Sequence, residues 1–154
     1  MSATGKNYVV DDFTTVYSTA IMAPGTVVES EGFEYRFIQN GDTDTATAGT
    51  PLILESTSEW KGCYDISDGL YYGGFLGVAM ADMETGEYGF VMKEGVYNTC
   101  TALNAIALGA EICAGNTDGG FRAATSAEVQ APAGVCLEAQ TQAATGMSIY
   151  VKGL

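Results

Sequence analysis

The side chains best able to do chemistry are few and scattered along this chain. Its 154 residues include no histidine, which removes Ser-His-Asp and Cys-His catalysis and the commonest metal ligand. Asp65 and Asp68 form a carboxylate pair, but glycoside hydrolysis requires two carboxyl groups that face each other across a sugar. Asp42 and Asp44 are spaced as in a calcium loop, yet the later glycine and glutamate positions are missing. We therefore predict a protein that is not an enzyme and uses no cofactor or metal.

The cysteines offer no redox or zinc motif either. No two of the four are spaced as C-x-x-C, and residues 1–6 have no apolar run of the kind found in export signals. We read the cysteines as reduced, small, buried apolar residues, with disulfide bonds as the alternative. They are Cys63, Cys100, Cys113 and Cys136.

The charge balance excludes two classes of partner. Lysine and arginine number 6 and aspartate and glutamate 19, so the net charge is −13. Binding to nucleic acid or to an anionic membrane surface requires clusters of basic residues, and here the basic residues are scattered singly. No apolar run approaches the length needed to span a bilayer. We predict neither a nucleic-acid partner nor a membrane partner.

The pattern of short runs predicts an all-β domain. Runs rich in β-branched and aromatic residues are separated by turns, and 20 glycines with only 3 prolines supply those turns. Residues 25–40 read as a hairpin with an aromatic face, and 26–154 as one domain. The window 99–108 is the only helix-like stretch, with an apolar loop as its alternative.

Two stretches place aromatic and aliphatic side chains in polar surroundings. Segment 1–25 reads either as an arm that orders against a partner or as an ordinary first strand and loop. The aromatic-rich loop 56–76 reads as a protein contact, a sugar platform or a loop packed on itself. The candidate interface residues are Tyr8, Val9, Val10, Phe13, Trp60, Tyr71, Tyr72 and Phe75.

The chain contains two segments of similar sequence. Gly77-Val78-Ala79-Met80 matches Gly134-Val135-Cys136-Leu137, and the Thr85-Gly86 turn matches Thr145-Gly146 at nearly the same spacing. Each match reads as a strand, a glycine turn and a returning strand. Two such hairpin units indicate a pseudo-symmetric barrel or sandwich. The units span about residues 48–95 and 108–153.

The order of these motifs resembles the small capsid decoration (cement) proteins of tailed bacteriophages. The resemblance covers about residues 75–154. The motifs that carry it are Gly77-Val78-Ala79, Thr85-Gly86-Glu87, Gly95-Val96-Tyr97, Gly109-Ala110-Glu111-Ile112, Asp118-Gly119-Gly120-Phe121, Gly134-Val135-Cys136-Leu137-Glu138-Ala139 and 146–151.

The resemblance implies a small β-barrel or β-tulip-like domain with an N-terminal arm, here 1–25. The long aromatic-rich loop 56–76 and the marked acidity depart from the family's usual pattern. The resemblance also implies a homotrimer that assembles in the host cytoplasm, sits on the outer capsid surface and stabilises contacts between major capsid protein subunits.

Other functions remain open from the residues. One is a carbohydrate-binding β module that stacks sugars on Trp60, Tyr64, Tyr71 and Tyr72, which predicts exposed rings on the free protein. Another is a β domain of a phage tail or baseplate.

Overall fold

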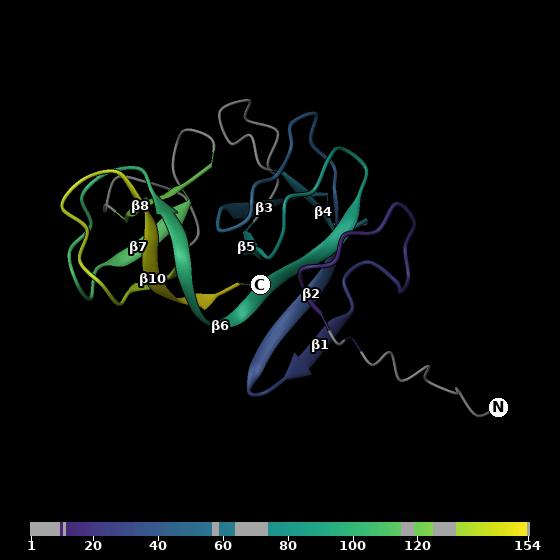
Figure 1. Cartoon of the computed structure of the whole chain (residues 1–154), viewed down its shortest axis with the longest axis horizontal. Coiled ribbons are helices and arrows are strands. Elements are labelled where there is room, and N and C mark those ends of the chain that lie inside the picture. The colour runs from purple at the N-terminus through teal and green to yellow at the C-terminus, as the bar shows by residue number, and fades with distance from the viewer. Residues whose placement is uncertain are drawn as a thin grey trace.

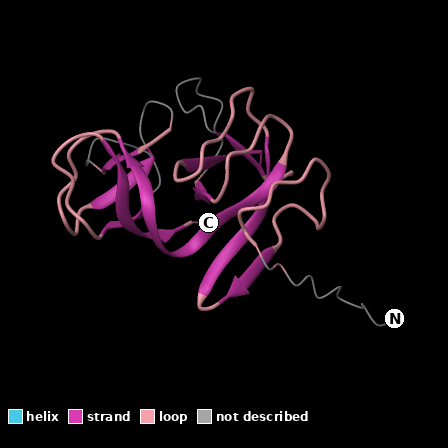
Figure 2. Cartoon of the chain, in the orientation of Figure 1, coloured by secondary structure: helices cyan, strands magenta, loops and turns pink. Residues whose placement is uncertain are grey.

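The structure, a computed structural model, describes residues 10, 12–56, 59–63, 74–114, 119–124 and 132–153. The described part contains strands and loops and no helix (Figure 2), which confirms the all-β prediction. The strands are β1 (Val27–Ser30), β2 (Phe33–Asn40), β3 (Pro51–Ser56), β4 (Lys61–Cys63), β5 (Phe75–Ala79), β6 (Tyr88–Ala102), β7 (Glu111–Ala114), β8 (Phe121–Ala123), β9 (Pro132–Cys136) and β10 (Ala144–Lys152).

All ten strands join one sheet that is partly ringed rather than a clean barrel. Its order is β1-β2-β4-β3-β5-β6-β10-β9-β7-β8, and further pairings join β2 to β6 and β6 to β8. These pairings make two five-strand circuits that share the long strand β6, which crosses the middle of the molecule (Figure 1). We call β2 to β5 with the first half of β6 the first unit. The second half of β6 with β7 to β10 is the second unit.

Alternation along the strands assigns side chains to the inside or outside of each unit. Ile38, Leu52, Leu76 and Val91 form a cluster inside the first unit. A second, larger cluster fills the inside of the second unit and continues onto the outer face of the first. Phe75 and Phe121, with ring centroids 5.9 Å apart, join these two parts. The two units therefore pack as one body.

A bulged glycine occupies the same place in each unit. Gly77 has φ 156° and Gly134 has φ 150°, a backbone region that other residues rarely adopt. A Cβ atom on Gly77 would meet the carbonyl oxygen of Met92, and one on Gly134 would meet that of Tyr150. The register shifts opposite both glycines, between β3 and β5 and between β7 and β9, as in a β-bulge.

Backbone contacts around these glycines also correspond. Gly49 donates a hydrogen bond to the carbonyl of Ala79, and Gly109 donates one to that of Cys136. An isolated bridge joins Ala46 to Met83 in the first unit, and another joins Ile106 to Gln140 in the second. The matched glycines of the two units therefore make matched contacts.

Two local predictions have clear outcomes. The hairpin is confirmed, since β1 pairs antiparallel with β2 and Ser30 lies opposite Phe33. The helical reading of 99–108 is wrong. This stretch continues β6 to Ala102, because Thr101 pairs with Thr145 on β10 and tertiary pairing overrides the weak apolar periodicity. The loop reading holds for the residues that follow.

Within the described ranges, no helix has the length and apolar character needed to cross a bilayer.

Candidate interaction surfaces

The described part of the N-terminal segment packs on its own chain. It lies beside β2 and β6, as the purple trace in Figure 1 shows. Phe13 stacks on Tyr35 with ring centroids 3.8 Å apart and meets Phe90 edge-on at 5.1 Å. Farther along, Tyr17 exchanges two backbone hydrogen bonds with Tyr88. The segment 12–22 therefore covers the outer face of the first unit.

The predicted arm residues divide accordingly. Val10 and Phe13 are half-buried against the larger apolar cluster. Tyr8 and Val9 lie outside the described residues. A contact between Phe13 and another molecule would thus compete with its stacking on Tyr35.

The predicted aromatic loop is only partly described. Tyr64, Tyr71 and Tyr72 lie outside the described residues. Phe75 begins β5 and is 2% exposed, so its ring belongs to the core and offers no surface to a partner. It was singled out with the loop because sequence alone does not show where a loop ends and a buried strand begins.

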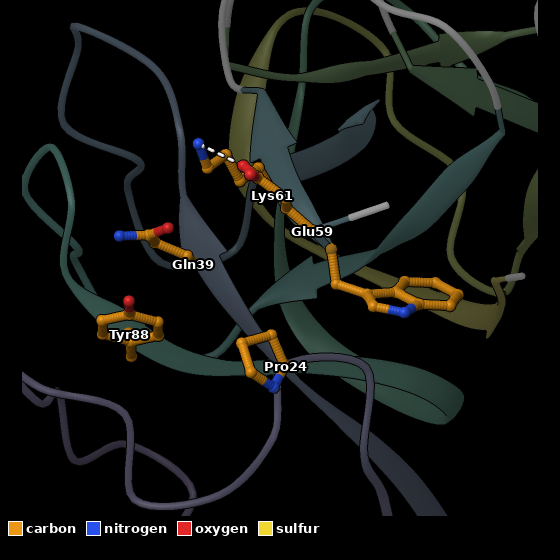
Figure 3. A pocket seen from close by; sticks show the side chains of 6 residues that line it. Pro24, Gln39, Glu59, Lys61 and Tyr88 are labelled. Atoms are coloured by element: carbon orange, nitrogen blue, oxygen red, sulfur yellow. Dashed lines mark ion pairs between the residues drawn. The ribbon is translucent and has the colours of Figure 1, made fainter. Parts of the chain in front are cut away.

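Trp60 is the predicted aromatic that borders a surface pocket. The pocket has a volume of about 410 Å³ and is lined by Pro24, Gln39, Glu59, Trp60, Lys61 and Tyr88 (Figure 3). The guanidinium carbon of Arg36 lies 4.4 Å from the centroid of the Trp60 ring, a cation–π arrangement. Burial lowers the pKa of Arg36, although Glu34 opposes the shift. The half-buried indole thus helps to shield an arginine, which is a structural role.

The pocket carries no evident catalytic arrangement. Lys61 and Glu59 form an ion pair with an N–O distance of 2.5 Å, and that hydrogen bond raises the pKa of Lys61. Gln39 is held by a 2.9 Å hydrogen bond to the carbonyl of Gly86. Among the described residues, no group of three or more histidine, cysteine or acidic side chains is placed to hold a metal. Asp65 and Asp68 lie outside the described ranges.

Two of the cysteines are buried thiols. Cys100 and Cys136 are free and fully buried, and burial strongly raises the pKa of Cys100. The thiol of Cys136 donates a hydrogen bond to the carbonyl of Glu138 at 3.1 Å. A thiol that stays protonated in the core is a poor nucleophile, so Cys100 acts as a packing residue. Cys136 is buried in the same apolar cluster and also acts as a packing residue.

A surface that the sequence did not indicate lies on the second unit. Val96 on β6 pairs with Tyr150 on β10, which pairs with Val135 on β9. These three side chains form one row across three strands, and they are 39%, 38% and 37% exposed. We call Val96, Tyr150 and Val135 the second outer row. Leu137, 43% exposed, follows Val135 along the chain beyond the buried Cys136 and extends the apolar surface.

The second outer row borders a shallow hollow of about 240 Å³, lined by Glu111, Pro132, Gly134, Val135, Tyr150 and Lys152. Glu94 accepts a 2.9 Å hydrogen bond from the Tyr150 hydroxyl, which raises the pKa of Tyr150. Glu111 pairs directly with Val135. The surface is therefore apolar along the row and acidic beside it, with Lys152 as a basic neighbour.

A weak signal for this surface was present in the sequence. In 147–152, apolar Met147, Ile149 and Val151 alternate with the residues between them, so Tyr150 and Lys152 share the opposite face of a strand. Alternation groups Tyr150 with one face, but it does not say whether that face meets solvent. That answer depends on which segments pack above it.

The described strands define an all-β protein with two related units. The family model for the phage cement protein matches residues 38–153, which covers most of both units. The chain therefore belongs to the phage cement protein family and is a structural protein of the phage virion, located at the capsid.

Among solved structures, the chain is similar to the N base of the head fiber gp8.5 in bacteriophage phi29. The TM-score is 0.51 at 12% sequence identity, over 78% of this chain and 98% of that one. At this identity the likeness shows a shared fold. No curated protein matches the chain.

Proposed function

We propose that this chain is a head decoration protein that binds the outer surface of the capsid and stabilises contacts between neighbouring major capsid protein subunits. The observation that carries the proposal is the match to the phage cement family, because it spans residues 38–153 and so includes most of both units. The likeness to the base of a phage head fiber adds a second virion protein with this fold.

The charge of the chain supports an outward position. A net charge of −13 repels packaged DNA, so the outside of the shell is the electrostatically favoured side. A binding partner that holds together subunits of the intact shell also stabilises the shell by mass action, since it binds the assembled state and not the separated one.

The proposal includes a homotrimer that joins the shell in the host cytoplasm. The buried thiols of Cys100 and Cys136 support a reducing compartment, since neither depends on oxidation to pack. Light scattering of the purified protein at micromolar concentration tests the trimer, and a monomer both in solution and on the shell would contradict it.

The stabilising role is tested on shells assembled without this protein. Purified full-length chain is added, bound protein is measured by sedimentation, and the shells are then heated until they release DNA. We expect decorated shells to release DNA at a higher temperature than bare shells. Binding without any change in the release temperature would contradict the stabilising role, and absence of binding would contradict the whole proposal.

A further inference from the structure

The second outer row has a counterpart in the first unit. Tyr35 pairs with Met92, which pairs with Val78, in the same register as Val96, Tyr150 and Val135. We call Tyr35, Met92 and Val78 the first outer row. All three of its side chains are buried, whereas each member of the second outer row keeps more than a third of its surface exposed.

The N-terminal segment that packs on the first outer row indicates what kind of chain such a row can bind. Phe13 lies flat on Tyr35, and Ile21 packs against the same cluster. Tyr17 adds two backbone hydrogen bonds to Tyr88, at the beginning of β6. The occupant is thus an irregular, extended piece of chain that places an aromatic ring on the row.

The acidic side chains near the second outer row determine which kind of chain can bind there. Glu94 and Glu111 lie directly beside it, and Glu138 lies within hydrogen-bond distance of Ser148 on the same strand as Tyr150. Lys152, which pairs with Glu94, balances one of these three carboxylates, so the surroundings of the row keep an acidic excess. The chain's own segment 10–22 contains two aspartates and no basic residue, and the whole chain carries −13. Docking a second copy here would bring like charges together, while a basic partner would gain from the same carboxylates.

We propose that the second outer row docks an extended segment of the shell protein that places an apolar side chain on Tyr150 and a lysine or arginine against Glu94 and Glu111. The inference rests on the proposed function and names the surface by which it is carried out. Apolar burial along the row supplies the attraction, and the acidic side chains align the segment.

The test compares variants of the full-length protein on shells assembled without it. The double variant Tyr150→Thr with Val135→Thr removes most of the row and places residues with high β propensity in both strands. Val27→Thr is the matched control, because Val27 is 42% exposed on β1, outside this surface. Circular dichroism and light scattering check the fold and the mass of each variant.

We expect the double variant to bind shells at least about ten-fold more weakly, at unchanged mass in solution, while Val27→Thr binds as the original protein does. A second variant, Glu111→Lys, leaves the apolar row intact and keeps the test usable if the double variant folds poorly. It is expected to bind several-fold more weakly and with a smaller dependence on salt.

The outcomes separate the two proposals. If the original protein does not bind shells, the proposed function fails. If the original protein binds and both row and charge variants bind equally well, the docking surface is wrong and the proposed function stands. If the double variant lowers the mass of the free protein but still binds shells, the row is a contact between copies of this chain, which overturns the inference.

Discussion

The outer faces of the two units have the same strand arrangement, but one face is buried and the other is exposed to solvent. Each carries a row of three side chains on neighbouring strands, next to a bulged glycine, Gly77 in one unit and Gly134 in the other. In the first unit the row is 8% exposed or less at every position, because the N-terminal segment and the neighbouring unit pack around it. In the second unit no described segment lies over the row. The strands set the geometry of a face, and the segments packed above it decide its exposure.

Because of this difference in exposure, the two rows are suited to different roles. The first outer row stabilises the chain, since its apolar area is already removed from water. The second outer row still has apolar area to bury, which makes it the face suited to assembly. The predictions below compare the two rows directly.

The largest expected effect comes from truncating Met92 and Tyr150, which are the middle residues of the first and the second outer row. Met92→Ala removes a buried side chain and leaves a cavity, so we expect a loss of about 2–5 kcal/mol in the free energy of unfolding. Tyr150→Ala removes a partly exposed side chain and its exposed hydrogen bond to Glu94, so its loss should be clearly smaller. Urea unfolding of both variants measures the difference. Equal losses would show that the two rows do not differ as described.

A smaller effect is expected from the segment that covers the first unit. Phe13→Ala removes a half-buried ring stacked on Tyr35 and exposes part of the first outer row. We expect a loss of about 1–2 kcal/mol, less than for a fully buried phenylalanine. Ser18→Ala, at an exposed position of the same segment, serves as the control and should change stability by less than about 0.5 kcal/mol. Denaturant unfolding in which Phe13→Ala matches Ser18→Ala would mean that the segment is not a cover.

The smallest effect concerns the tyrosines of the two rows. Burial, with a contribution from Glu31, raises the pKa of Tyr35, whereas the hydrogen bond to Glu94 is the main cause that raises the pKa of Tyr150. Because both pKa values are raised in the folded protein, the stability due to each tyrosine is complete below the ordinary value of 10.0. It is lost as the pH rises through the folded value.

Glu94→Ala should therefore lower the pH at which Tyr150 ionises and leave Tyr35 unchanged. Ultraviolet difference titration, with Tyr150→Phe to identify the signal of that residue, measures the shift. If the titration of Tyr150 does not move in Glu94→Ala, the hydrogen bond is not the main cause of its raised pKa.

Part of the fold could be predicted because its signals are local. Turn glycines and β-branched runs predict strands, and the hairpin over β1 and β2 follows from two such runs and one turn. The window 99–108 was ambiguous because its apolar spacing is also compatible with a short helix. Pairing of Thr101 with Thr145, more than forty residues away, decided in favour of a strand.

The candidate surfaces were harder to predict because they also depend on contacts between segments far apart in the chain. Phe13 and Phe75 were selected as interface candidates because they stand in polar stretches, yet both pack against the core. The second outer row was not selected, because a valine or tyrosine in an alternating strand looks the same whether its face is covered or open. Aromatic content identifies side chains able to make a contact, and it does not identify the partner they contact.

The sequence by itself determined the all-β class, the turn at Thr85-Gly86, the lack of histidine, the acidic charge and the resemblance to phage cement proteins. These follow from residue type and short-range spacing, which the chain displays directly. The predicted turn at Thr145-Gly146 is wrong, because both residues lie within β10 and Thr145 pairs with Thr101 on β6. Only the tertiary structure decided that Tyr35, Met92 and Val78 are covered while Val96, Tyr150 and Val135 are open. The physical reason is that burial depends on segments far apart in the chain, and strand alternation fixes only which side chains share a face.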